Sequence, residues 1–270
     1  MAYLRIIRPV NCLIALISVL VGGWIGQRVG FSASLLFAGL IGFVVCAFGN
    51  IFNDIKDIEI DRINNPERPL ASGALTVNSA LFMAIISSIL PAIASFFLGV
   101  WPFIIVITAL LLLLFYSTYL KKTLAGNFTV AVIAGLSFVL GGLVTGNPIC
   151  IVPLIFSIFI HLPREIVKDV IDMKGDKVIG AITLPIIVGP FRAYNISALL
   201  LGILCLLLPL PYVWGILNVA YIVIVLIFAY PIILYTIWRL FRKPRPDELR
   251  LISELIKTSM VIGLAAMIVS

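Results

Sequence analysis

Long apolar runs alternate with short polar segments along the whole chain. The runs lie near residues 11–29, 33–55, 77–98, 101–119, 127–146, 149–171, 191–209, 213–238 and 250–269. A bilayer core of about 30 Å is crossed by roughly 20 apolar helical residues, and each run is close to that length. The pattern predicts an all-α membrane protein, with nine transmembrane helices in one bundle and a single domain over residues 1–270.

The polar segments differ in charge according to the side on which they fall. If the runs cross the membrane in turn, the N-terminus and segments 54–76, 120–126, 164–192 and 239–250 share one side. All twelve acidic residues and every basic residue except Arg28 fall there or, for Glu254 and Lys257, in the first two turns of the adjoining run 250–269. Because basic residues collect in cytoplasmic loops, we expect a cytoplasmic N-terminus and a C-terminus on the outside. We expect this multi-pass protein in the cell membrane.

The composition excludes most other classes of protein. Hydrophobic residues make up 62% of the chain and charged residues 11%, and the mean hydropathy is +1.22. A soluble domain is roughly half apolar and about one quarter charged, so a cytosolic globular protein and a disordered chain are excluded. The four cysteines are widely spaced and predict small buried side chains, not a zinc site. We interpret the first apolar run as a retained helix, although Arg5 and Arg8 before it also resemble a signal peptide.

Two acidic clusters carry the same spacing, D-x-x-D-x-x-x-D, each at the cytoplasmic end of an apolar run. They contain Asp54, Asp57 and Asp61, and Asp169, Asp172 and Asp176. Helical residues three or four apart share a face, so each cluster predicts a stripe of carboxylates whose repulsion needs a cation. Mg²⁺ prefers such oxygen ligands together with substrate phosphates. The clusters therefore predict a magnesium and diphosphate site, and the alternative is solvated helix ends.

Basic and amide residues accompany the acidic clusters on the same side. The loop Asn64–Gly73 contains two prolines, and we expect it to present Arg68 to the first cluster, where a guanidinium can bind phosphate. Lys121 and Arg8, with Asn11, are either further substrate-binding groups or topology signals. The stretch from Arg239 to Arg250 predicts a solvated loop attracted to anionic lipid headgroups. We expect no nucleic-acid partner, since membrane topology already explains the basic loops.

At these motifs the chain resembles the UbiA superfamily of intramembrane prenyltransferases. Asn53, Asp54, Asp57 and Asp61 match its N-D-x-x-D-x-x-x-D signature, and Arg68 to Gly73 match R-P-x-x-S-G. Asp172 and Asp176 match its second signature, D-x-x-x-D. Tyr116 and Lys121 match its tyrosine–lysine element with one extra residue between them. Within the superfamily, the Arg8–Cys12 opening and the Arg164–Asp169 run resemble the archaeal ether-lipid branch.

The resemblance implies a chemistry that agrees with the residues. It implies a Mg²⁺-dependent transfer of a geranylgeranyl group from its diphosphate to the hydroxyl of geranylgeranylglyceryl phosphate, an amphiphilic lipid acceptor. The implied catalytic residues are Asp57, Asp61, Asp172, Asp176 and Lys121, and the metal ligands are these four aspartates with Asn53. The implied substrate-binding residues are Asn53, Arg68, Arg8, Asn11, Tyr116, Arg164, Lys168, Asp54 and Asp169. Among them, Arg8, Arg164 or Lys168 would bind the acceptor phosphate, while Phe52, Tyr116 and Phe138 can shelter an allylic cation.

Two other functions stay open at this point. The same reaction type can use an aromatic acceptor, such as 4-hydroxybenzoate or another quinone or haem precursor. A secondary transporter also buries carboxylates, but its sites lie near the middle of the bilayer on broken helices. In this sequence every acidic residue lies near one membrane face, which favours the enzyme.

Overall fold

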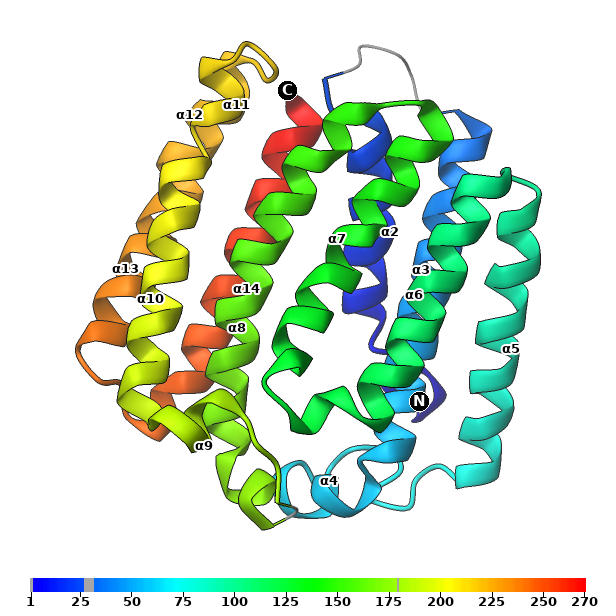
Figure 1. Ribbon diagram of the computed structural model, residues 1–270, viewed down its shortest axis with the longest axis vertical. Coiled ribbons are helices and arrows are strands. Elements are labelled where there is room, and N and C mark those ends of the chain that lie inside the picture. The colour runs from blue at the N-terminus through cyan, green and yellow to red at the C-terminus, as the bar shows by residue number, and fades with distance from the viewer. Residues whose placement is uncertain (1, 27–31, 179) are drawn as a thin grey trace. The chain divides into compact units, whose positions relative to one another are not determined.

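The computed structural model describes residues 2–26, 32–178 and 180–270, and every regular element in those ranges is helical (Figure 1). The elements are α1 (Ala2–Ile7), α2 (Pro9–Trp24), α3 (Ala33–Lys56), α4 (Ile58–Asn64), α5 (Val77–Phe96), α6 (Val100–Thr118), η1 (Leu120–Lys122), α7 (Ala125–Thr145), η2 (Pro148–Cys150), α8 (Ile151–Val178), α9 (Leu184–Val188), α10 (Pro190–Leu207), α11 (Leu210–Val213), α12 (Val219–Ile224), the π-helical η3 (Val225–Ala229), α13 (Tyr230–Phe241) and α14 (Pro246–Val269).

The predicted spans agree with these helices. Among the described residues, eight helical segments are long and apolar enough to cross a membrane, and α2 is a shorter apolar helix. The all-helical membrane fold is thereby confirmed, whereas the count of nine spans and the orientation of the termini stay predictions. Arg28, the one basic residue assigned to the outer side, lies outside the described residues.

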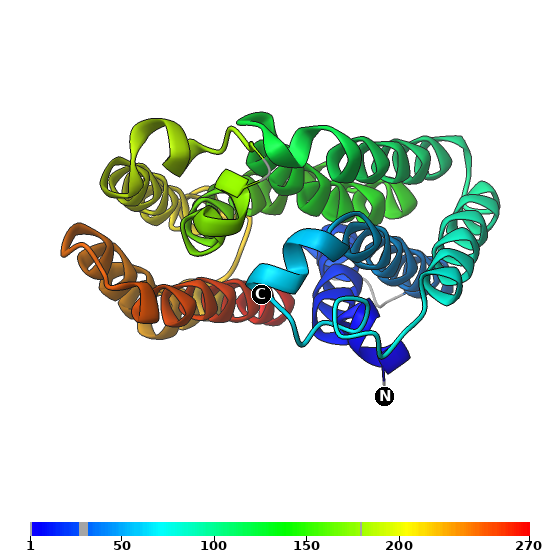
Figure 2. The same ribbon diagram turned by 90° about the horizontal axis from the view of Figure 1, so that it is seen from below.

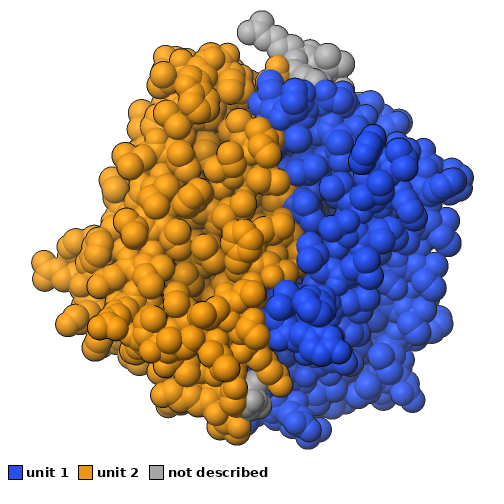
Figure 3. Space-filling model, viewed as in Figure 1, with its two compact units in different colours: residues 1–24, 29–121, 136–150 blue, residues 25–28, 122–135, 151–270 orange. Residues whose placement is uncertain are grey.

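The chain divides into two compact units, which Figure 3 colours separately and which we describe one at a time. Unit 1 comprises residues 1–24, 29–121 and 136–150, and unit 2 comprises residues 25–28, 122–135 and 151–270.

Helix α3 is the centre of unit 1. It packs against α1, α2, α5 and α6. In its most apolar 18-residue stretch 56% of the residues are buried, against 28% in the corresponding stretches of α5 and of α6. Ile41, Phe48 and Ile51 of α3 belong to the buried core of the unit. Ser32 caps the start of α3 by accepting a hydrogen bond from the Leu35 amide at 3.1 Å. The end of the best-buried helix therefore carries the first acidic cluster.

Glycines let α2 approach the second half of α7 within unit 1. A methyl group on Gly22 would collide with the backbone of Phe138, and one on Gly141 would collide with the Val19 carbonyl. Helices in a bilayer gain little from hydrophobic burial against each other, so small residues that permit close backbone contact stabilise them. Thr145 adds a hydrogen bond to the Gly23 carbonyl at 3.1 Å.

Helix α8 is the longest element of unit 2 and packs against α9, α10 and α14, while α13 lies beside α10 and α14 (Figure 2). Leu201 and Leu204 of α10 and Leu249, Ile252 and Ile256 of α14 are almost fully buried. Ser197 of α10 donates to the Pro163 carbonyl of α8 at 3.5 Å. This packing holds the half of α8 that carries the second acidic cluster.

Candidate functional site

The first acidic cluster lies where α3 ends and α4 begins, so its three carboxylates do not share one uninterrupted helix. The backbone of Asp57 leaves helical geometry with φ −100° and ψ 6°. Hydrogen bonds nevertheless continue across it, from the Asp57 amide to the Asn53 carbonyl at 3.0 Å and from the Asp61 amide to the Asp57 carbonyl at 2.7 Å. The helix is therefore interrupted at Asp57, although Asp54 and Asp61 still contact the same Arg68 Nη1, as the expected stripe requires.

All three carboxylates of this cluster are buried and each contacts a cation. Asp54, Asp57 and Asp61 are 2%, 6% and 4% exposed. Asp54 pairs with Arg8, Asp57 with Lys121 and Asp61 with Arg68. A buried carboxylate without a partner would be strongly destabilising, so the cations stabilise the cluster. The alternative of solvated helix ends is wrong for this cluster.

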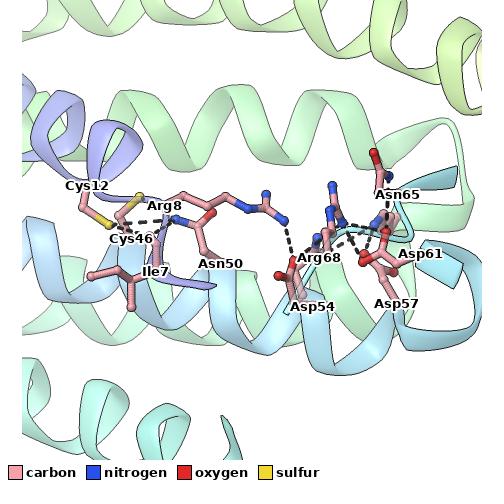
Figure 4. A network of polar contacts seen from close by, with 12 residues as sticks. Ile7, Arg8, Cys12, Cys46, Asn50, Asp54, Asp57, Asp61, Asn65 and Arg68 are labelled. Carbon is pink, nitrogen blue, oxygen red and sulfur yellow. Dashed lines mark hydrogen bonds and ion pairs between the residues drawn. The ribbon is translucent and has the colours of Figure 1, made fainter. Parts of the chain in front are cut away.

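Arg68 reaches the cluster from the loop after α4, as the proline-rich sequence predicted (Figure 4). Its Nη1 lies 2.7 Å from each carboxylate oxygen of Asp61 and 3.6 Å from Asp54 Oδ1. The turn is fixed locally by the Arg68 amide, which donates to the Asn65 carbonyl at 3.0 Å. Burial alone would lower the pKa of Arg68, but the charges of Asp61 and Asp54 outweigh it and raise that pKa. Arg68 therefore stays cationic at all physiological pH values.

Lys121 and Arg8 belong to unit 1 and lie far apart in the sequence. Lys121 follows α6 in η1, where its Nζ also lies 3.4 Å from Asn53 Oδ1. Arg8 lies at the corner between α1 and α2, where its carbonyl accepts from the Asn11 amide at 2.9 Å. Tyr116 is half-buried in the last turn of α6. Unit 1 thus brings together the first cluster, Asn53 and the three predicted cations.

The second cluster lies on α8, which continues as one helix to Val178. Asp176 is buried, and Asp169 and Asp172 are half-buried. The side chain of Asn127, at the start of α7, donates to Asp169 Oδ2 at 2.7 Å. The predicted helical stripe therefore holds for this cluster.

Arg164 and Lys168 both contact Glu165. Lys168 Nζ lies 2.7 Å from Glu165 Oε2, and Arg164 Nη1 lies 3.3 Å from Oε1. Glu165 is 6% exposed, so a buried carboxylate orients two cations from neighbouring turns of one helix. Unit 2 thus contains the second cluster and the two cations predicted for the acceptor phosphate.

The polar residues of these networks that were not predicted include Asn50, which donates to the Ile7 carbonyl at 2.9 Å, and Asn65, which donates to Asp61 Oδ1 at 3.4 Å. Asn127 and Glu165 were not predicted either. Glu165 carried a signal, since an acid between Arg164 and Lys168 at helical spacing predicts an ion-paired group. Asn50 stands one helical turn before Asp54, which also marks it as a neighbour. Asn127 had no signal, because its partner Asp169 is remote in sequence.

The donor sets suit a hard divalent cation, although the described residues contain no group of three His, Cys, Asp or Glu side chains arranged to hold one. Asp57 and Asp61 offer carboxylate oxygens and Asn53 an amide oxygen. Mg²⁺ is typically bound by one or two carboxylates with substrate phosphates completing its shell. The residues present therefore fit Mg²⁺ when a phosphorylated substrate supplies the remaining ligands.

A family model described as the UbiA prenyltransferase family matches residues 15–257. The chain belongs to the UbiA prenyltransferase family. The digeranylgeranylglyceryl phosphate synthase of Methanosphaera stadtmanae is 35% identical over 263 residues, covering 97% of this chain and 96% of that protein. These matches confirm the resemblance to the UbiA superfamily that the sequence motifs indicated.

Solved structures agree with the family. One of digeranylgeranylglyceryl phosphate synthase is 34% identical, with a TM-score of 0.78 over 99% of this chain and 96% of the other. A UbiA homologue from Archaeoglobus fulgidus, bound to GPP and Mg²⁺, is 21% identical, with a TM-score of 0.69 over 99% of both chains. At that identity the homologue shares the fold alone.

Proposed function

We propose that this family member transfers a geranylgeranyl group from geranylgeranyl diphosphate to the free hydroxyl of geranylgeranylglyceryl phosphate. The observation that carries the proposal is the 35% identity to a digeranylgeranylglyceryl phosphate synthase over nearly the full length of both chains. The first cluster supports it, because its buried carboxylates and three basic side chains suit a metal-bound diphosphate.

We assign the metal ligands to Asn53, Asp57 and Asp61 of the first cluster and to Asp172 and Asp176 of the second. This assignment rests on the matching spacing of the two clusters and on their oxygen donors. It does not depend on how the two units are arranged. Mg²⁺ held by these residues would supply positive charge to the diphosphate as the allylic C–O bond breaks. A UbiA homologue of the same fold is bound to GPP and Mg²⁺, which supports the choice of ion.

Arg68 and Lys121 stabilise the leaving diphosphate. A guanidinium and an ammonium within the same buried cluster interact strongly with developing negative charge, because little water screens them. The allylic carbon then forms an ether bond with the acceptor hydroxyl, whose proton passes to the released diphosphate. Tyr116 of α6 and Phe52 of α3 are the aromatic side chains that we assign to the cation, and exclusion of water prevents its capture as the alcohol.

Arg164 and Lys168 bind the phosphate of the acceptor in this proposal, with Arg8 and Asn11 as further substrate-binding residues. The Glu165 carboxylate restrains both cations in unit 2 without neutralising them completely. Two cations around one carboxylate leave one net positive charge, which suits an acceptor that carries a phosphate. Asp54 and Asp169 are the remaining acidic residues that we predict to bind substrate.

The protein acts as a multi-pass membrane protein of a single functional domain, with its acidic clusters at the cytoplasmic face. The placement of every basic residue except Arg28 on the side of the N-terminus supports this orientation. The prenyl chains of both substrates would lie among the apolar helices.

A competition between acceptors tests the proposal. Purified protein in detergent receives geranylgeranyl diphosphate and Mg²⁺ with geranylgeranylglyceryl phosphate or with 4-hydroxybenzoate, and the products are identified by mass spectrometry. We expect one ether bond and one diphosphate per turnover with the lipid acceptor alone. Prenylation of 4-hydroxybenzoate in preference to the lipid would overturn the acceptor, and metal-independent turnover would overturn the role of Mg²⁺.

A further inference from the structure

The corner between α1 and α2 has a backbone conformation that its neighbours must stabilise. Helix α1 ends at Ile7 and α2 begins at Pro9. Between them Arg8 has φ +52°, in the left-handed region that non-glycine residues seldom adopt. Strained conformations of this kind persist where surrounding contacts fix them, and they are frequent at functional sites.

Asn50 of α3 fixes this corner through the backbone. Its Nδ2 donates a hydrogen bond to the Ile7 carbonyl at 2.9 Å, and the Cys12 thiol donates to the same oxygen at 3.0 Å (Figure 4). Asp54, which pairs with the Arg8 guanidinium, follows Asn50 by four residues and so lies on the same face of α3. One helix face therefore holds Arg8 at two points, its backbone and its guanidinium.

Asp54 also faces a second arginine. Arg68 Nη1 lies 3.6 Å from Asp54 Oδ1, the oxygen that Arg8 contacts. The Asp54 side chain is 2% exposed, whereas those of Arg8 and Arg68 are 29% and 27% exposed. The carboxylate is thus enclosed, while both arginine side chains stay partly exposed, and each guanidinium carries five N–H donors.

We propose that Asn50 and Asp54 are positioning residues that hold Arg8 beside Arg68, so that the two guanidinium groups together bind a phosphate group of a substrate. In this proposal Asp54 orients the two arginines and is not a ligand of Mg²⁺, unlike Asp57 three residues later. The inference rests on the proposed prenyl transfer. The phosphate belongs to the prenyl diphosphate or to the lipid acceptor, and separate KM values distinguish these sources.

Two variants test this assignment. Asp54→Asn changes the proposed positioning residue, and Asp57→Asn makes the same change at the proposed metal ligand for comparison. We expect Asp54→Asn to weaken inorganic pyrophosphate binding, measured by calorimetry without Mg²⁺, by about tenfold, the usual cost of losing an orienting partner. The KM for one substrate rises correspondingly, while the Mg²⁺ concentration for half-maximal activity stays unchanged. A shift in that Mg²⁺ requirement like the one in Asp57→Asn, with unchanged pyrophosphate binding, overturns the proposal.

A double-mutant cycle tests whether Asn50 acts through Arg8. We expect Asn50→Ala to raise the same KM several-fold in the natural background and to have no effect in an Arg8→Ala background, since the group it positions is gone. Cys46→Ala is the control, because it removes a sulfur 3.7 Å from the same amide and leaves the hydrogen bond from Asn50 to the Ile7 carbonyl in place. Additive effects of the two substitutions overturn the role of Asn50.

The remaining outcomes are also informative. If Asn50→Ala does not insert, Asn50→Ser takes its place in the cycle, and the pyrophosphate measurement on Asp54→Asn stands independently. Failure of the unsubstituted protein to transfer a prenyl group refutes the proposed function. Normal transfer together with unaltered pyrophosphate binding in Asp54→Asn refutes only this inference.

Discussion

The two acidic clusters have the same sequence spacing but different surroundings. In unit 1 the chain breaks its helix at Asp57, and Arg8, Arg68 and Lys121 from three other segments pair with the three carboxylates. In unit 2 the carboxylates stay on the uninterrupted α8, where Asp169 accepts from Asn127 and Arg164 and Lys168 pair with Glu165.

This difference indicates a division of labour between the clusters. A carboxylate that is buried and paired with a cation is fixed in place, so the first cluster is rigid and carries its own counter-charges. In the second cluster Asp169 accepts from a neutral amide, and Asp172 and Asp176 are the residues assigned to the metal. We infer that the first cluster arranges the diphosphate and its surrounding cations, and that the second contributes mainly metal ligands.

The largest effect should come from removing a metal ligand of either cluster. Asp57→Ala and Asp172→Ala should each lower kcat at saturating Mg²⁺ by about a thousandfold or more, since charge stabilisation on the leaving group is lost. Product formation per minute by purified, correctly inserted protein is the measurement.

A matched variant controls for the loss of an acidic side chain. Asp247→Ala removes an aspartate that is 71% exposed and should leave the rate unchanged. If Asp57→Ala is inactive and Asp172→Ala retains full activity with Mg²⁺, the clusters do not act jointly and the comparison between them loses its functional meaning.

A smaller effect is expected from Glu165, the carboxylate that orients the two cations of unit 2. Glu165→Gln keeps the shape of the side chain but removes its charge, so Arg164 and Lys168 lose their common partner. We expect the KM for geranylgeranylglyceryl phosphate to rise about tenfold, as is typical when an orienting group is lost, with an unchanged KM for the prenyl diphosphate.

Glu59 provides the control for that substitution, because it is exposed on α4. Glu59→Gln should leave both KM values as they are. An equal rise in the donor KM of Glu165→Gln would place Arg164 and Lys168 with the diphosphate and contradict their assignment to the acceptor.

Much of the fold could be predicted because the bilayer imposes a simple length rule on apolar helices. The ends of α3, α5 and α6 lie within a few residues of the predicted runs. The proline-rich loop likewise predicted that Arg68 would return to the first acidic cluster, where it contacts Asp61. The break at Asp57 could not be predicted, because aspartates at helical spacing are compatible with a continuous helix.

The missed polar contacts have a common physical reason. Asn127 with Asp169, and Asn50 with the Ile7 carbonyl, join segments that are remote in sequence. An amide side chain carries no charge and matches no spacing rule, so its partner is decided by tertiary packing alone. Glu165 differs, since its contacts are local and its charge pattern was available in the sequence.

The smallest effect should come from Asn127, and it measures how firmly the second cluster is held. Asn127→Ala removes the 2.7 Å hydrogen bond to Asp169, a contact worth about 1 kcal/mol, and should raise the Mg²⁺ concentration for half-maximal activity about fivefold with little change in kcat. Asn195→Ala, at an exposed position on α10, is the control. Because the first cluster keeps all its cations in this variant, the shift isolates the metal-binding part of unit 2. A loss of kcat without any shift in the Mg²⁺ requirement would mean that Asp169 orients substrate instead, and the two clusters would then share one role.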